Sequence, residues 1–357
     1  MKYLITSGCS FTRQEYRCNT EGTCSDFQND FIEMWRWPHW IENLYNVNVL
    51  NYGSATNDNH TIANSIIYGV EKLLKKGVLA EDISVIAQWS NFSRQAFFIS
   101  NEKIDEFGID LKGLAHISDW IEEKEYNGQY GYWFLTGGYG VGHVDNKIKE
   151  FLPYFIKYIL SNDNCLIYHF EAMLKLQNYL KLKGIEYKTF DIQNNFSKSY
   201  TKDSGMGFPN YRETDKDKFS ESVLDRKFIP NTWELDNLYD YSDTPYVKNL
   251  IDMVDWSNHW FYKEDGITKH GGIIEWAIRN WDVSNLKTYP NRPLDTNKSV
   301  YADILFMEHH NKTLEEIKYE MDNRWYLGHV SSRLNKKFVK EILSEFLSKY
   351  TLKNKLL

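Results

Sequence analysis

The chain has 357 residues, of which 42% are apolar and 25% are charged, a balance typical of a soluble globular protein. Its formal net charge is -7 and its Lys and Arg residues form no long run. This argues against nucleic acid as a partner, because nucleic-acid binding needs a basic surface. No stretch approaches the roughly 18 apolar residues of a membrane span, so we expect no membrane insertion. The N-terminus has no apolar run typical of a secretory signal, and we expect the protein to be made in the cytoplasm.

Polar and apolar residues predict an alternation of strands and helices. Short apolar runs bounded by Gly or Asn predict buried strands at 3–6, 46–51, 83–88 and 187–190. Apolar residues at helical spacing predict helices at 62–74, 147–160, 168–182 and 334–346. Asn57, Asp58 and Asn59 are candidate N-cap residues of the first helix, and Gly184 ends the third. This order is typical of a parallel sheet with helices on both faces.

Two long segments interrupt the alternation, at about 97–145 and 193–311. The first is rich in Gly, Tyr and Trp, and the second is polar, aromatic and irregular. Loops of this length in a compact domain usually serve as lids, binding surfaces or assembly contacts. We therefore predict one α/β domain over 1–357 with two large aromatic-rich insertions.

Aromatic residues make up 16% of the chain, with 12 Trp and 25 Tyr. Flat rings bury a large area at little entropic cost, so aromatic-rich surfaces are typical of carbohydrate and protein contacts. Packing of the rings in the core is the other explanation, and the sequence leaves both open.

The four cysteines lie at positions 9, 18, 24 and 165. Without a secretory signal, free thiols are favoured over a disulfide between Cys18 and Cys24. No further ligands lie near that pair at the spacing of a zinc site, so we expect neither a metal nor a cofactor.

Two of the predicted strands end directly on residues suited to acyl chemistry. Ser10, in Gly8-Cys9-Ser10, follows the first strand, at the sheet edge where α/β proteins build their sites. Gly53 follows the second strand, where a glycine lets the backbone approach a substrate and offers an N–H to an oxyanion. Taken alone, each also fits an ordinary turn between a strand and a helix.

An amide side chain follows the third predicted strand. Asn91 can donate a hydrogen bond to the same oxyanion, with Gln88 or Ser90 as substitutes. A capped loop is the simpler explanation of these residues.

Two histidines are candidates for the base that would activate Ser10. His329 precedes the closing helix, which Ser331 or Ser332 can cap, and a helix N-terminus favours the neutral imidazole that accepts a proton. His270 follows Asp265 by five positions and precedes Gly271-Gly272 and another apparent helix. We prefer His329 because it lies ahead of the final helix.

The order and spacing of these residues resemble the SGNH (GDSL-like) hydrolase superfamily. Gly8-Cys9-Ser10 matches the family's Gly-Asp-Ser, Gly53 its second glycine, Asn91 its Gly-x-Asn-Asp asparagine, and His329 its His before the last helix. The resemblance covers 1–95, about 147–192 and 325–350. The aromatic-rich style looks like the versions found in bacteriophage proteins.

This resemblance implies a three-layer, flavodoxin-like α/β fold and a serine ester hydrolase. Ser10 would be the nucleophile and His329 its base, while the N–H groups of Ser10 and Gly53 and the side chain of Asn91 would form the oxyanion hole. The substrate class would be an acylated small molecule or carbohydrate, such as an O-acetylated sugar. Oligomers or assembly into a virion are compatible with the phage-like style.

Departures from the family pattern concern the base and the third motif. The family usually has Asp three residues before its catalytic His, but this chain has Tyr326. Asp322 is the candidate replacement, with a backbone carbonyl or a Ser-His dyad as other options. Trp89 stands where the third motif has glycine. A binding or structural module that lost the chemistry, and a transferase that passes the acyl group to a sugar hydroxyl, therefore stay open.

Overall fold

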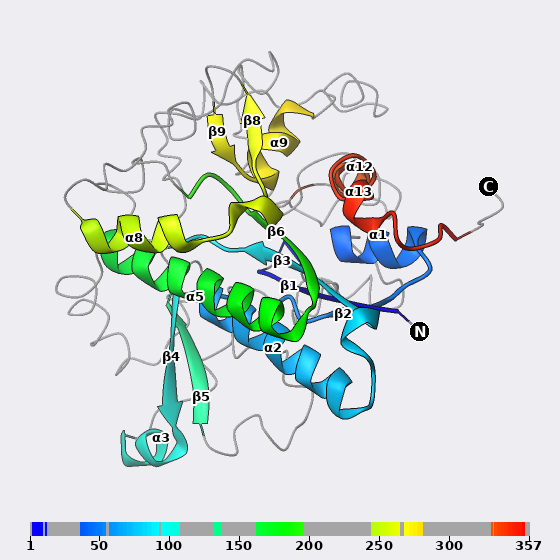
Figure 1. Ribbon diagram of the computed structural model, residues 1–357. Helices are drawn as coiled ribbons and strands as arrows, with labels where there is room; N and C mark the ends of the chain where they lie inside the picture. Colours follow the sequence, from blue (N-terminus) through cyan, green and yellow to red (C-terminus); the bar gives the residue numbers. More distant parts are fainter. Residues whose placement is uncertain are drawn as a thin grey trace, which may run out of the picture.

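A computed structural model describes residues 2–9, 11–12, 36–54, 57–92, 94–107, 131–136, 162–195, 244–264, 268–280, 330 and 332–353. Its main sheet has five parallel strands in the order β2-β1-β3-β6-β7, the flavodoxin-like order expected from the sequence (Figure 1). The strands are β1 (Tyr3–Ser7), β2 (Asn48–Asn51), β3 (Ile83–Trp89), β6 (Glu186–Asp191) and β7 (His259–Trp260).

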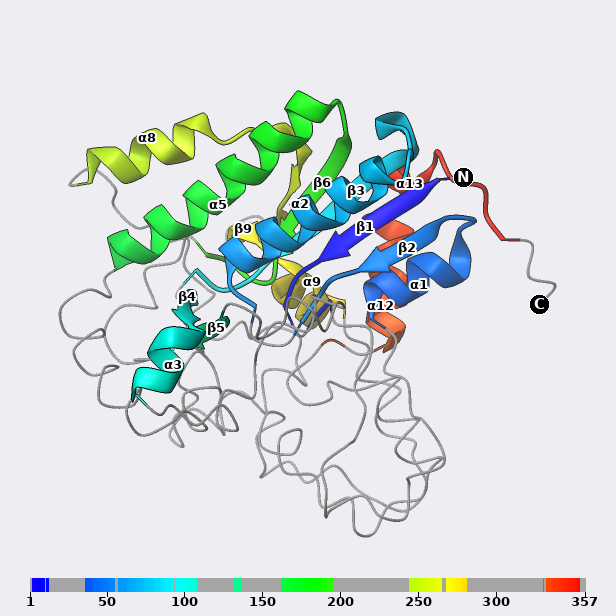
Figure 2. The same cartoon turned by 90° about the horizontal axis from the view of Figure 1, so that it is seen from below.

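Helices cover both faces of the sheet, which gives three layers (Figures 1 and 2). One face carries α2 (Asn59–Lys75), α5 (Asn162–Lys183) and α8 (Pro245–Met253). The other carries α1 (Trp37–Leu44), α9 (Ile273–Arg279), α12 (Ser332–Glu341) and α13 (Ser344–Leu347). The predicted α/β class with a parallel sheet is confirmed.

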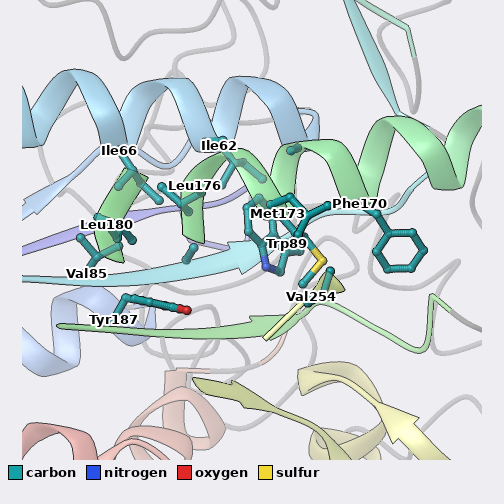
Figure 3. Close-up of a cluster of buried hydrophobic side chains, with 14 of the residues drawn as sticks. Ile62, Ile66, Val85, Trp89, Phe170, Met173, Leu176, Leu180, Tyr187 and Val254 are labelled. Carbon is teal, nitrogen blue, oxygen red and sulfur yellow. The ribbon is translucent and has the colours of Figure 1, made fainter. Parts of the chain in front are cut away.

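Alternate residues of each strand enter different hydrophobic clusters, as the two-residue repeat of a strand requires. Leu4 of β1 belongs to the cluster beneath α1 and α12, whereas Ile5 belongs to the cluster beneath α2 and α5. Figure 3 shows the second cluster, in which Ile66 of α2 and Leu176 of α5 lie over Val85 of β3. All seven residues of β3 are buried, as expected for the central strand of a doubly covered sheet.

The helix boundaries near the sheet follow the capping residues in the sequence. Asp58 caps α2 by accepting a hydrogen bond from the Thr61 N–H at 2.7 Å. Gly184 ends α5 with a φ of +67°, a conformation that residues other than glycine rarely adopt, and the Ile185 N–H then donates back to Leu180 O at 2.9 Å. Both of these sequence predictions are confirmed.

The prediction that 193–311 is irregular is wrong in part, because the described residues of this segment include regular helices and strands. Within it, α8 packs on α5, β7 extends the main sheet beside β6, and β8 (Tyr262–Glu264) pairs with β9 (Thr268–Gly271) ahead of α9. β7 has only two residues and β8 three, too few to show a strand period in the sequence. Residues 196–243 and 281–311 lie outside the described residues.

The segment at 97–145 begins with regular structure too. β4 (Gln95–Ser100) pairs antiparallel with β5 (Gly131–Thr136), and α3 (Asn101–Phe107) follows β4. This hairpin projects away from the main sheet (Figure 1).

Two predicted helices have different outcomes. The closing helix at 334–346 is divided into α12 and α13, with the chain turning at Ile342 and Leu343. The helix at 147–160 falls on undescribed residues. No helix in the described part of the chain is long and apolar enough to cross a membrane.

Candidate active site

The parallel strands β1, β2, β3 and β6 end at the same edge of the sheet, the carboxyl edge (Figure 2). After β1 the chain crosses to β2 on one side, whereas β3 and β6 lie on the other, so a topological switch point falls between β1 and β3. Open α/β sheets bind their ligands at such points. The loops after β1, β2, β3 and β6 and the start of α2 contain buried polar residues, among them Thr12, Ser54, Asn57, Asn59, Ser90, Asn91, Asn194 and Asn195, and Gln88 is buried near the end of β3.

The turn after β1 is held by Thr12. The Thr12 N–H donates to Cys9 O at 2.8 Å, and its hydroxyl donates to Gln88 Oε1. A Cβ on Gly8 would collide with the Thr12 side chain, so only glycine fits there. Ser10 lies within this turn but outside the described residues.

Asn51, the last residue of β2, joins the next loop to this turn. Its Nδ2 donates to Thr12 O at 2.7 Å, while its Oδ1 accepts from Thr6 Oγ1 at 3.0 Å and from the Gly53 N–H at 2.9 Å. A Cβ on Gly53 would lie 2.8 Å from Thr12 Cβ, so glycine is required by a close approach to the first loop. The N–H that the sequence analysis assigned to an oxyanion donates here to Asn51.

Gly8 O accepts two hydrogen bonds from the loop after β2. The Ser54 N–H donates at 3.1 Å and Asn57 Nδ2 also at 3.1 Å. Asn57 and Ser54 therefore fix the chain immediately before Cys9 and Ser10.

The loop after β3 carries the predicted oxyanion donor. Asn91 is buried, and its backbone O accepts from the Arg94 N–H at 3.2 Å. Trp89, at the position where the SGNH pattern has glycine, is fully buried in the cluster beneath α2 and α5, where Figure 3 labels it. Trp89 faces the same cluster as Val85 and Ala87, because alternate residues of a strand point to the same side of the sheet.

A buried His–Asp pair lies at the end of β6. His259 Nε2 is 3.3 Å from Asp191 Oδ2, and His259 Nδ1 is 2.9 Å from Thr189 Oγ1. Nδ1 is hydrogen-bonded to Thr189, Nε2 faces the Asp191 carboxylate without a hydrogen bond, and the side chain has no exposed surface. We therefore assign His259 a structural role and do not count it as a base for Ser10.

The predicted base His329, its candidate acid Asp322, and Tyr326 all lie outside the described residues. Val330, the residue after His329, is buried in the same hydrophobic cluster as Cys9 and Phe11, the neighbours of Ser10. Val330 O accepts hydrogen bonds from Arg36 Nη1 at 3.2 Å and Asn335 Nδ2 at 2.9 Å.

The rival base His270 lies on β9, three residues before the start of α9, with its ring centroid 5.1 Å from that of Phe261. The start of α9 is held against the loop after β6, since the Ile274 N–H donates to Ile192 O at 3.0 Å. The helix predicted after Gly271-Gly272 is confirmed, whereas Asp265 lies outside the described residues.

Glu275 joins α9 to the β6 loop from inside the protein. Its two oxygens accept from the N–H groups of Gly272 and Asn194, each at 2.8 Å. Burial is the largest influence on this carboxyl group and raises its pKa to about 7.

Sequence analysis missed four buried residues beside these loops, namely Asn59, His169, Asp191 and His259. Asp191 had a usable signal, because it directly follows a predicted strand. Asn59 was considered only as a cap, and the two histidines are brought to the sheet by α5 and β7. Among the described residues, no group of three or more His, Cys, Asp or Glu is arranged to hold a metal ion. Comparisons with protein-family models, curated proteins and solved structures found no match.

Proposed function

We propose that this chain is a serine ester hydrolase of the SGNH type with Ser10 as nucleophile. The observation that carries the proposal is the position of the Gly8–Thr12 turn at the switch point between β1 and β3. Both neighbouring strands help to hold this turn, through Asn51 of β2 and Asn57 of the loop after it on one side and Gln88 of β3 on the other.

The proposed reaction is acyl transfer to water. A histidine accepts the Ser10 proton as Oγ attacks the ester carbonyl, and the imidazolium then protonates the leaving alcohol. Water, deprotonated by the same ring, releases the acyl group. His329 is the proposed base, supported by the burial of Val330 in one cluster with Cys9 and Phe11. Asp322 is its proposed acid.

The proposed oxyanion hole uses the Ser10 N–H and the Asn91 side chain, with Gly53 as a third donor. The Gly53 N–H can donate to the oxyanion only if it gives up its hydrogen bond to Asn51 Oδ1 and turns toward the substrate. Removing one such donor lowers kcat on the order of a hundredfold to a thousandfold.

A carbohydrate O-acetyl ester is the proposed substrate. β4 and β5 lead away from the loop after β3 and carry several Phe, Tyr and Trp residues. The proposal rests on this aromatic-rich sequence, because aromatic rings suit the flat faces of sugar rings.

Ser10→Ala should lower hydrolysis of p-nitrophenyl acetate by about a thousandfold or more, because the nucleophile is lost. Ser257→Ala, at an exposed serine whose hydroxyl donates to Asp255 at 2.6 Å, is the control and should keep full activity. Substituting His329 and His270 separately by Ala identifies the base. Unchanged turnover in Ser10→Ala would reject the assignment.

A binding or structural module with this fold, such as a virion component, is the second candidate. The hydrogen bond from the Gly53 N–H to Asn51 Oδ1 favours this second candidate, because the N–H proposed for the oxyanion hole already has an acceptor. Stoichiometric labelling of Ser10 by a fluorophosphonate probe would exclude this candidate, and a folded but unreactive protein would support it.

A further inference from the structure

The side-chain amide of Asn59 forms hydrogen bonds with the backbone of Ser90, the first residue beyond β3. Asn59, the first residue of α2, accepts from the Ser90 N–H at 2.7 Å through Oδ1 and donates to Ser90 O at 3.3 Å through Nδ2. The parallel ladder between β3 and β6 ends at the Trp89–Asp191 pair. Asn59 therefore supplies the hydrogen bonds that a neighbouring strand would otherwise give to Ser90.

His169 of α5 determines how the Asn59 amide is oriented. Its Nδ1 lies 2.7 Å from Asn59 Nδ2. Because Asn59 Oδ1 accepts from Ser90, the group facing His169 is the NH₂, which only donates. Nδ1 must therefore accept, so the ring is neutral and carries its proton on Nε2. Complete burial agrees with this, since it lowers the pKa of His169 to about 4.

A second buried amide contacts the same peptide. Asn195 Nδ2 donates to Ser90 O at 3.3 Å and to Asp191 Oδ1 at 3.0 Å. Ser90 Oγ in turn accepts from Arg94 Nη1 at 3.0 Å. All of these side chains are at least nine-tenths buried, so the segment before Asn91 is held from within the core.

We infer that His169 is a positioning residue of the active site, acting through Asn59 on the Ser90–Asn91 segment. This inference rests on the proposed function, because it gives that segment its role of holding the oxyanion donor. His169 touches no reacting atom. Its ring keeps the Asn59 amide in the orientation that fixes the Ser90 peptide, and thereby the site of Asn91.

The test compares two substitutions of similar shape. His169→Asn leaves an oxygen near the position of Nδ1 that can accept from Asn59, whereas His169→Leu leaves none. We expect His169→Leu to lower kcat for p-nitrophenyl acetate by about tenfold with little change in KM, because a lost hydrogen bond of this kind changes an equilibrium by about that factor. His169→Asn should recover most of the rate.

Gln177 of α5 offers a matched control. Its amide contacts Asp255 as the Asn59 amide contacts Ser90. Nε2 donates to Asp255 O at 3.1 Å, and Oε1 accepts from the Asp255 N–H at 3.0 Å. Gln177→Leu removes a direct side-chain contact with the backbone, of the kind that Asn59 makes, away from the carboxyl edge of the sheet. It should leave kcat unchanged.

Amide hydrogen exchange provides a readout that does not require catalysis. In His169→Leu the Ser90 N–H should exchange about tenfold faster while the Asp255 N–H is unchanged, and Gln177→Leu should do the reverse. Equal acceleration at both amides, or an unchanged Ser90 N–H, would overturn the inference. If exchange follows this pattern but the wild-type protein does not react with a fluorophosphonate, the proposed function fails and the positioning of Ser90 stands.

Discussion

Thr12, in the turn after β1, lies between the ends of β2 and β3 and contacts both strands. Its backbone N–H closes the turn onto Cys9, its O accepts from Asn51 and its hydroxyl contacts Gln88. Gly53 leaves room for its side chain. One β-branched residue thus joins the segments on which the proposed chemistry depends.

At the same scale, Gly53→Ala should destabilise the protein. The new methyl group would lie 2.8 Å from Thr12 Cβ and 2.9 Å from its backbone carbon, and the backbone cannot yield cheaply. We expect a loss of about 2 kcal/mol in the free energy of unfolding, measured by urea denaturation. Glu81→Ala, at an exposed residue of the 3-10 turn before β3, is the control and should leave the stability unchanged. Equal stability of Gly53→Ala and the wild type would contradict the close approach.

At the scale of elements, α9 depends on one buried carboxyl group. Glu275 accepts from Gly272 at the start of its own helix and from Asn194 in the loop after β6. The first contact is one half of a capping box. Gly272 allows the helix to approach the Asp191–Gln193 backbone where no Cβ would fit.

This carboxyl group should make stability depend on pH. Its folded pKa is raised to about 7 from an ordinary 4.5. The stabilisation is fully present below pH 4.5 and is lost as the pH rises through about 7, because the folded state takes up a proton in that window. The free energy of unfolding should therefore fall between pH 5 and pH 8, by up to about 3 kcal/mol from this group.

Glu275→Gln is the control, since it keeps an acceptor and cannot titrate. The difference between wild type and variant, measured by urea denaturation at both pH values, isolates this group from His169. His169 acts in the opposite direction, because its lowered pKa makes stability fall toward acid pH. A difference that does not change with pH would show that Glu275 is ionised in the folded protein.

At the scale of the whole molecule, late segments complete the sheet and cover one of its faces. β7, from residues 259–260, pairs with β6, and α8 packs on α5. On the opposite face, side chains of α9 and α12 cover Leu4, Ile86 and Phe190. The two ends of the chain are therefore parts of one core.

A chain that stops at residue 243 should consequently fail to fold. It would lack β7, α8, α9, α12 and α13, so that α1 alone of the described helices would cover Leu4 and Ile86 and much of this face would be exposed to water. We expect no cooperative unfolding transition by circular dichroism. A chain that stops at Lys353, beyond α13, should unfold like the full-length protein. A cooperative transition in the shorter chain would show that residues 1–243 form an independent domain.

By itself, the sequence predicted the strands β1, β2, β3 and β6, the boundaries set by Asp58 and Gly184, and the α/β class. These features depend on local patterns, namely apolar runs, capping side chains and a glycine at positive φ. It also predicted that Ser10, Gly53 and Asn91 follow strand ends. Their joint role in acyl chemistry remains a prediction.

Only the tertiary structure decided which residues surround those strand ends. Asn59, His169 and His259 come from α2, α5 and a two-residue strand, and no local pattern reports that they converge. Gly53 follows its strand as predicted, but its N–H donates to Asn51 and its missing side chain makes room for Thr12. The physical reason is that hydrogen bonds between side chains distant in sequence depend on the packing of helices on the sheet, which a local period does not encode.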